Sequence, residues 1–301
     1  MEDTPAANLR RMLLGESIIV VPGIYDGYTA RLALAAGFDV LYMTGAGTSM
    51  SRLGMADLGM ATMNEMADNA SMIAGINRSI PLIADADTGY GGPLMVRRTV
   101  QEYIKGGVAS LHLEDQVQTK RCGHLANKEL VDEDVFISRI RAASLARDQM
   151  PHGDIVLIAR TDALESLGYD AAVGRLKKAI AAGADVALME ALTSIEQMKA
   201  ICHDLAPTPV ILNAVPGGKT PDLTAKEAEQ MGFKMIVFPT LALAPVHEAV
   251  LGAAKYLKDN GKVRATDILA KGPRALFEVC GLSELIAFDI SAGSQAFQSN
   301  A

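Results

Sequence analysis

Acidic side chains follow two neighbouring hydrophobic segments of the sequence, at the points where those segments end. Asp85 and Asp87 come directly after Leu82–Ala84, and Glu114 follows Ser110–Leu113. Residues two apart in an extended chain point the same way, so the two aspartates can face one ligand. Three oxygen donors suit a hard divalent cation, and we predict that Asp85, Asp87 and Glu114 bind Mg²⁺, with Mn²⁺ as a possible substitute. The alternative is that the Asp-Thr-Gly sequence here is only a turn.

A thiol lies a few residues further on, in the sequence TKRCGHLANK at residues 119–128. Cys122 is flanked there by Lys120, Arg121 and His124. Cationic neighbours of this kind lower the pKa of a thiol and make it reactive. The alternative is a surface turn whose charges are simply solvated. The decapeptide alone supports the two interpretations about equally, because thiol reactivity depends on neighbours in three dimensions.

Small and cationic residues end other hydrophobic segments. Thr44, Gly45 and Ala46 follow the second segment, and their backbone N–H groups are suited to holding a carboxylate or phosphate. A tight turn is the alternative. Arg160 ends the segment Ile155–Ala159 and must be paired, either with a carboxylate ligand or with Glu190.

Two further polar residues belong to the same pattern. Asn213 follows the seventh segment and places an amide at its end. His112 lies inside its segment, one residue before Leu113. We interpret it as a core histidine satisfied by its neighbours, not as a catalyst.

The elements that position these groups form a regular series. Eight short apolar segments have the length of strands buried on both faces; they are Ser17–Val21, Val40–Met43, Leu82–Ala84, Ser110–Leu113, Ile155–Ala159, Val186–Met189, Val210–Leu212 and Met235–Phe238. Segments of helical spacing between them stop at glycine, as helices capped in the left-handed conformation do; these are Ala30–Ala36, Val96–Lys105, Ala171–Ala182 and Thr224–Met231, followed by Gly37, Gly106, Gly183 and Gly232.

This repetition predicts a (β/α)₈ TIM barrel with its chemistry at the carboxyl ends of the strands. A doubly wound open sheet is the competing fold. No linker divides the chain, so we expect a single domain over residues 1–301 in which 241–301 form a helical C-terminal extension. Ala244–Lys258 and Pro273–Val279 are its predicted helices.

Composition limits the classes of protein to which the chain can belong. Its 301 residues carry a formal net charge of −7 without a basic block, which argues against nucleic acid as a partner. No run of 18 apolar residues is present, so we expect no membrane span. Three widely spaced cysteines without a zinc-ligand pattern fit a reducing compartment. No signal or transit peptide is recognised, and we expect a cytoplasmic enzyme.

Two motifs together resemble the isocitrate lyase and phosphoenolpyruvate mutase superfamily. The first is Ala84-Asp85-Ala86-Asp87-Thr88-Gly89-Tyr90-Gly91. The second is Lys120-Arg121-Cys122-Gly123-His124 after Glu114-Asp115-Gln116. The resemblance extends from about Val21 to Pro239 and implies a (β/α)₈ barrel whose last helix is exchanged between subunits, giving a homotetramer of two helix-swapped dimers. It also implies Mg²⁺ and a small α-oxycarboxylate substrate.

The cysteine loop is similar to that of the carbon–carbon lyases of this superfamily. The resemblance implies that Cys122 is the acid that protonates the carbanion left by bond cleavage, with Lys120 among its cationic neighbours and Arg160 steadying the oxyanion. It implies Tyr42 or a metal-bound water as the base, and the turn at residues 44–46 as the site of the C1 carboxylate. The remaining substrate-binding or loop-ordering residues are expected to be Asp57, Gly123, His124, Glu190 and Asn213.

The choice of substrate depends on two absences. The run Phe238–Pro245 has no arginine for the third carboxylate that methylisocitrate lyases bind. Oxaloacetate hydrolases are marked by a hydroxyl residue near the position of Asn213, and here the two residues that follow Asn213 are apolar. The resemblance therefore favours a lyase that cleaves C2–C3 of a substituted malate, such as 2,3-dimethylmalate, to a 2-oxo acid and a carboxylate. The alternatives are an oxaloacetate acetylhydrolase and, less favoured, a methylisocitrate lyase, a phosphonomutase or a non-catalytic barrel.

Overall fold

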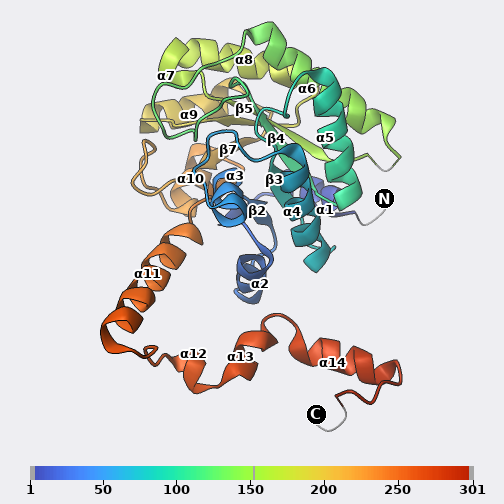
Figure 1. The fold of residues 1–301 in the computed structure, drawn as a ribbon. Coiled ribbons are helices and arrows are strands. Elements are labelled where there is room, and N and C mark those ends of the chain that lie inside the picture. Colours follow the sequence, from blue (N-terminus) through green and yellow to red (C-terminus); the bar gives the residue numbers. More distant parts are fainter. Residues whose placement is uncertain (1–3, 152, 298–301) are drawn as a thin grey trace.

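The computed structural model describes residues 4–151 and 153–297, and its centre is a closed barrel of parallel strands (Figure 1). Each strand pairs with the next one in the chain, and β1 pairs with β8 to close the ring. The predicted TIM barrel is therefore confirmed and the open sheet is wrong. The strands are β1 (Ile19–Ile24), β2 (Leu41–Met43), β3 (Leu82–Asp85), β4 (Ser110–Glu114), β5 (Val156–Thr161), β6 (Val186–Met189), β7 (Val210–Asn213) and β8 (Met235–Phe238).

Helices surround the barrel and connect successive strands. They are α1 (Pro5–Leu14), α2 (Gly27–Ala35), α3 (Gly45–Thr48), the π-helical turn η1 (Ser49–Leu53), α4 (Met63–Ile76), α5 (Pro93–Gly106), α6 (Glu133–Gln149), α7 (Leu164–Leu167), α8 (Tyr169–Ala181), α9 (Ile195–Asp204) and α10 (Ala225–Met231). The left-handed residue that ends α5 is Gly107, with φ 79°, and not the predicted Gly106. Gly37, Gly183 and Gly232 have positive φ as expected.

Two layers of apolar side chains hold these elements together. One fills the inside of the barrel, where Ile83, Ile158, Leu188 and Ile211 are almost completely buried. The other lies between the strands and the helices around them. Because the strands are covered on both faces, most of their residues are apolar, and the acids and Arg160 lie at the carboxyl ends.

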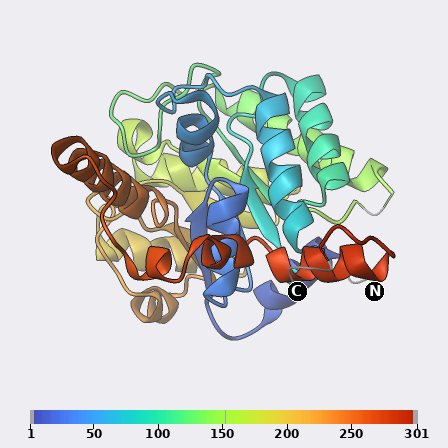
Figure 2. The same cartoon turned by 60° about the horizontal axis from the view of Figure 1, so that its bottom comes forward.

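Four helices after β8 form an arm that leaves the barrel: α11 (Leu243–Asn260), α12 (Asp267–Ala270), α13 (Pro273–Glu278) and α14 (Leu282–Ser291). Figure 1 shows the arm clear of the barrel, beyond α2, and Figure 2 shows the same extended course from another side. None of the described residues of these helices is buried. Large apolar side chains on the arm are exposed, including Val250, Phe277, Leu285 and Phe288. Among the described residues no helix is long and apolar enough to cross a membrane.

A substitution at Gly23 tests how closely β1 and the end of β8 pack where the barrel closes. It lies in β1 against the end of β8, and a Cβ atom there would lie 2.5 Å from Cα and O of Pro239. These are backbone atoms that cannot rotate away. We therefore expect Gly23→Ala to lower the free energy of unfolding by about 1–3 kcal/mol or more. Urea denaturation followed by circular dichroism measures the change.

Gly75→Ala is the matched control. Gly75 lies in α4 with open space around the added Cβ atom. Alanine is the better helix former by about 0.5–1 kcal/mol, so this variant should be as stable as the parent or more stable. Equal stability of the Gly23 and Gly75 variants would contradict the proposed tight contact.

Candidate active site

The predicted acidic cluster is buried at the carboxyl ends of β3 and β4. Asp85 and Glu114 are the last residues of their strands, and Asp87 follows β3 with φ 45°, an unfavourable conformation for a residue with a side chain. All three side chains are almost fully buried. Such strain is characteristic of functional sites, where surrounding structure holds it in place.

Lys120 brings a positive charge to these acids. Its Nζ lies 2.5 Å from Oδ1 of Asp87 and 2.7 Å from Oδ1 of Asp57. Burial by itself would lower the pKa of Lys120, but Asp87, Glu114 and the other acids around it raise that pKa well above its usual value. Burial raises the pKa of Asp87 to about 6, with Lys120 acting in the opposite direction. The structure thus brings Lys120 and Asp57 together with the predicted metal ligands.

The fit of a cation to this cluster depends on which groups already face its oxygen atoms. Oδ1 of Asp87 and Oε2 of Glu114 are buried, and each faces a cation of the protein: Nζ of Lys120 at 2.5 Å and NH1 of Arg160 at 3.2 Å. Over residues 4–151 and 153–297, however, no three His, Cys, Asp or Glu side chains converge as direct ligands of one ion. This donor set fits Mg²⁺ held largely through its own water molecules, which that ion retains readily. Binding by Asp85, Asp87 and Glu114 stays a prediction.

The turn after β2 has fewer free N–H groups than the sequence suggested. The N–H of Thr44 donates to the carbonyl of Ile24, and that of Gly45 donates to Oδ2 of Asp85 at 3.2 Å. Strand pairing and Asp85 thus use the donors of Thr44 and Gly45, and binding of a carboxylate by the N–H groups of all three residues stays a prediction. Thr44 and Ala46 do line the cavity.

Residues 119–128, here called the lid, lie closed over the site. Their stems are paired, since the N–H of Val117 donates to the carbonyl of Glu129 at 3.0 Å and that of Val131 to the carbonyl of Asp115 at 2.9 Å. Gly123 packs against the barrel so closely that a Cβ atom would lie 2.4 Å from NH2 of Arg160. Only glycine can take this place without displacing the arginine.

Cys122 lines the cavity beneath the lid, together with Arg160 and Asp85. Burial raises the pKa of the Cys122 thiol, a change that Arg160 opposes and Asp57 reinforces. The predicted lowering of this pKa by the adjacent cationic residues is therefore wrong: Lys120 is paired with acids, and Arg121 is exposed. A raised pKa favours the protonated thiol, which suits an acid better than a nucleophile.

Arg160 is held by several carboxylates. Its Nε donates to Oδ2 of Asp162 at 2.9 Å and its NH2 to Oδ1 at 3.1 Å, while NH1 lies 3.2 Å from Oε2 of Glu114. Glu190, the predicted structural partner, is farther away at 3.5 Å. The two-point partner is thus Asp162, a residue that the sequence analysis did not select although it lies only two positions away.

Glu190 organises the far side of the site. Its carboxylate accepts from Nδ2 of Asn213 at 3.0 and 3.1 Å and lies 3.0 Å from Nε2 of His124. Burial opposes ionisation, but Arg160 and His124 lower the pKa of Glu190 to about 2. An anion held in this way repels a substrate carboxylate, so of the two predicted roles the arrangement favours ordering of the closed lid.

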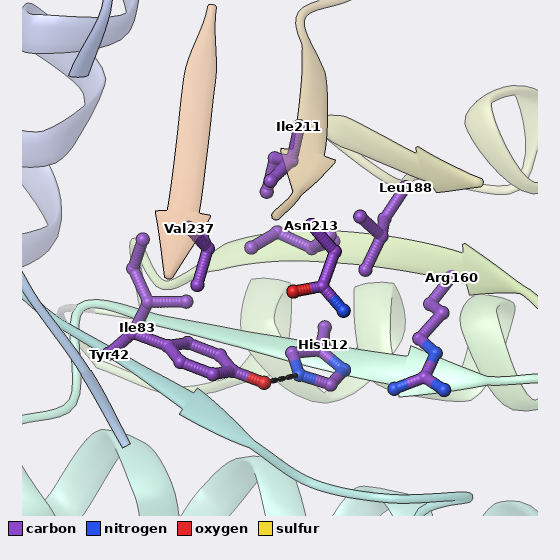
Figure 3. Close-up of a pocket in the computed structure, with 9 residues that line it drawn as sticks. Tyr42, Ile83, His112, Arg160, Leu188, Ile211, Asn213 and Val237 are labelled. Carbon is purple, nitrogen blue, oxygen red and sulfur yellow. Dashed lines mark hydrogen bonds between the residues drawn. The ribbon is translucent and has the colours of Figure 1, made fainter. Parts of the chain in front are cut away.

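His112 faces the barrel interior beside Tyr42 (Figure 3). Its Nε2 lies 2.8 Å from the Tyr42 hydroxyl group, but its buried Nδ1 has no hydrogen-bond partner among the described residues. The interpretation of a fully satisfied core histidine is therefore wrong for one nitrogen. Burial and the nearby Asp85 raise the pKa of Tyr42 well above its usual value. Both rings line a cavity of about 20 Å³ that reaches Arg160 and Asn213.

The main cavity under the lid has an apolar side that sequence analysis missed. Its volume is about 70 Å³. Asp85, Arg160 and Cys122 form part of its lining, and Val215, Pro239, Thr240 and Leu243 form another part. These residues come from the loops after β7 and β8 and from the start of α11, where the sequence was interpreted only by its lack of an arginine and of a hydroxyl residue. The hydroxyl of Thr240 is present, although not in the position that was considered.

Comparison with known proteins agrees with this geometry. A family model described as phosphoenolpyruvate phosphomutase matches residues 9–258. The 2,3-dimethylmalate lyase of Eubacterium barkeri is 39% identical over 255 residues, which are 85% of this chain and 86% of that protein.

Solved structures are similar over nearly the whole chain. A crystal structure of 2,3-dimethylmalate lyase, described as a member of the PEP mutase/isocitrate lyase superfamily, is 52% identical with a TM-score of 0.96, covering 99% of this chain and 98% of that one. A structure of oxaloacetate acetylhydrolase in complex with the inhibitor 3,3-difluorooxalacetate is 49% identical with a TM-score of 0.95, covering 98% and 99%. Lyases of this superfamily are generally metal-dependent. The chain therefore belongs to the phosphoenolpyruvate mutase/isocitrate lyase superfamily and is one of its lyases, as the two motifs predicted.

Proposed function

We propose that this enzyme cleaves the C2–C3 bond of a substituted malate such as 2,3-dimethylmalate, giving pyruvate and propanoate. The observation that carries the proposal is the position of Cys122, which lines the same cavity as Arg160 and Asp85, where burial raises the pKa of the thiol and so favours its protonated form. A thiol in that state can give a proton to carbon when the bond breaks. The 39% identity to a 2,3-dimethylmalate lyase supports the same reaction.

The proposed reaction begins with loss of the proton from the 2-hydroxyl group. The C2–C3 bond then breaks, C2 becomes the carbonyl of the 2-oxo acid, and the electron pair moves to C3 and its carboxylate. Cys122 donates its proton to C3, which completes the second product. The resulting thiolate regains a proton by way of the base, so atoms and charge balance over one turnover.

Residues of the cavity supply the other steps. Arg160 faces the developing oxyanion at C2, as fixed charges aimed at new charge do. Tyr42 is the proposed base, although its raised pKa means that it requires positive charge nearby to ionise. A divalent cation, for which we propose Mg²⁺ held by Asp85, Asp87 and Glu114, would supply that charge and make the 2-hydroxyl group more acidic. The closed lid excludes water.

The lining of the cavity supports an alkyl-substituted dicarboxylate. Val215, Pro239 and Leu243 offer apolar contacts for methyl groups. Arg160 is the sole arginine among the described residues that line the cavity, and it is already paired. A third substrate carboxylate would lack a partner, so a methylisocitrate lyase is disfavoured. A phosphonomutase is disfavoured because that branch characteristically lacks the cysteine.

An oxaloacetate acetylhydrolase is the second candidate, in which the same cavity would give oxalate and acetate. It is favoured by the Thr240 hydroxyl group in the cavity wall and by the 49% identity to a solved oxaloacetate acetylhydrolase.

We further propose that the arm packs against a second copy of this chain. Its helices contain no buried residue, yet Phe277, Leu285 and Phe288 are large, apolar and exposed. Large apolar side chains that are exposed together are usually covered by a partner. Exchange of the arm between two subunits, and pairing of two such dimers into a homotetramer, would cover it. The three free cysteines are consistent with the reducing cytoplasm, where we place the enzyme.

A side-by-side assay of the purified enzyme with Mg²⁺ tests the substrate. We expect pyruvate and propanoate from 2,3-dimethylmalate, with kcat/KM at least about tenfold above that for oxaloacetate, because the methyl groups meet the apolar wall. Chromatography that separates pyruvate from oxalate measures both products. Preferred formation of oxalate from oxaloacetate would establish the hydrolase, and turnover of neither substrate would contradict both candidates.

Cys122→Ser tests the acid. A serine hydroxyl is a much weaker acid than a thiol, so we expect kcat to fall by about 10²-fold or more. Binding of Mg²⁺, measured by isothermal titration calorimetry, should stay unchanged. Asp85→Asn is the matched comparison and should lose both activity and Mg²⁺ binding. Normal turnover by the serine variant would exclude Cys122 as the acid.

Light scattering with a charged substitution in the arm tests the assembly. We expect the parent to have the mass of a tetramer and Phe288→Glu to form smaller species at micromolar concentration, because a buried unpaired charge destabilises an interface. Leu14→Glu is the control, since Leu14 is 87% exposed on α1, outside the arm. A monomeric parent would contradict the exchange.

A further inference from the structure

Lys128, the last residue of the lid, has a buried ammonium group that the proposed reaction does not use. Its side chain is 2% exposed. Nζ lies 2.9 Å from Oδ1 of Asp162 and donates to the carbonyl of Gly123 at 2.7 Å. A charge that is removed from water must be paired and hydrogen-bonded to be tolerated, and both contacts do this for Lys128.

The two contacts join different parts of the molecule. Gly123 is the neighbour of Cys122 in the lid, and Asp162 directly follows β5 of the barrel. The distance from Lys128 to Asp162 therefore depends on the lid being closed. Lys128 ties the turn that carries the thiol to the rigid strand end beneath it.

The same carboxylate also holds Arg160. Oδ1 of Asp162 faces both Nζ of Lys128 and NH2 of Arg160, at 2.9 and 3.1 Å. Oδ2 accepts from Nε of Arg160. Lys128 and Arg160 share one buried carboxylate, so loss of the Lys128 charge changes the electrostatic interaction between Asp162 and Arg160.

Asp162 is itself fixed from behind. Its N–H donates to Oδ1 of Asp115 at 2.8 Å, and Oδ2 of Asp115 accepts from Arg175 of α8 at 3.1 Å. The Asp162 and Asp115 side chains are completely buried. A carboxylate held in this way moves little when the lid opens, so it provides a fixed point to which Lys128 can return.

We propose that Lys128 is a latch: its ion pair with Asp162 holds the lid closed and so positions both Cys122 and Arg160. Lys128 is a positioning residue and does not touch the reacting atoms. The consequence for turnover rests on the proposed function, whereas closure of the lid does not.

Alkylation of Cys122 measures closure without any substrate. Full-length parent and Lys128→Met enzymes are treated with iodoacetamide, and the rate of modification of each cysteine is followed by peptide mass spectrometry. Methionine has a similar length and no charge. We expect iodoacetamide to modify Cys122 about 10- to 100-fold faster in the variant than in the parent. The reason is that removing one partner of a buried ion pair strongly destabilises the closed lid that contains the pair.

Cys202 is the internal control in the same sample. It lies in α9, outside the lid, and should keep the rate of the parent. Lys219→Met is the matched variant, because Lys219 pairs with Glu165, the outer neighbour of Lys128, yet lies outside the lid. We expect it to leave the Cys122 rate unchanged. An unchanged Cys122 rate in Lys128→Met, or an equal increase at Cys122 and Cys202, would overturn the latch.

Steady-state kinetics with 2,3-dimethylmalate extends the test to the reaction. Lys128→Met should lower kcat at least about tenfold with a smaller change in KM, since fewer bound complexes are closed. Faster alkylation with unaltered kcat would show that the lid opens without affecting Arg160 and would overturn the positioning role. If neither enzyme turns over this substrate, the alkylation rates still decide the latch separately from the proposed function.

Discussion

Burial of charge at the carboxyl ends of β3, β4 and β5 is the constraint on which the other features of this site depend. Asp85, Asp87 and Glu114 are shielded from water, and so are the cations Arg160 and Lys120. Each of these charges alone would cost several kcal/mol in the interior, so the two sets must be present together. Arg160 comes from the barrel, but Lys120 comes from the lid. The lid therefore completes the charge balance of the site as well as covering it.

The same burial determines the chemistry of the thiol. Cys122 lies among cationic residues in the sequence, yet the cations nearest to it are engaged with carboxylates, and removal from water raises its pKa. A nucleophilic cysteine needs a thiolate, whereas an acid needs its proton, which a raised pKa favours. A lyase that must protonate a carbanion is consistent with such a cysteine, and the closed lid keeps bulk water from competing with it.

The cavity and the arm meet at one point of the chain. Leu243 lines the cavity and is also the first residue of α11, with which the arm begins. Packing of the arm against a second subunit would therefore affect the position of Leu243 and, with it, the apolar wall that this residue forms with Val215 and Pro239. The proposed assembly would thus be linked to the choice of substrate, because the helix that leaves the barrel starts at the cavity wall.

Much of this could be predicted from the order of residue types. Eight short apolar segments and helices ending at glycine sufficed for the barrel, because strands buried on both faces need continuous apolar sequence and left-handed caps favour glycine. The barrel then places strand ends at one rim, which is why Asp85, Glu114 and Arg160 could be grouped without coordinates. The motifs around Asp87 and Cys122 were specific enough to indicate the superfamily.

The rest depended on distances between groups far apart in the chain. Asp162 and not Glu190 holds Arg160 at two points, Lys128 reaches Asp162, and the donors of Thr44 and Gly45 are used within the protein. The sequence by itself determined which groups line the rim, because periodicity and local propensity act between near neighbours. Only the tertiary structure decided which of them are paired and which have their pKa shifted by burial, because pairing and burial depend on approach in space and not on order along the chain.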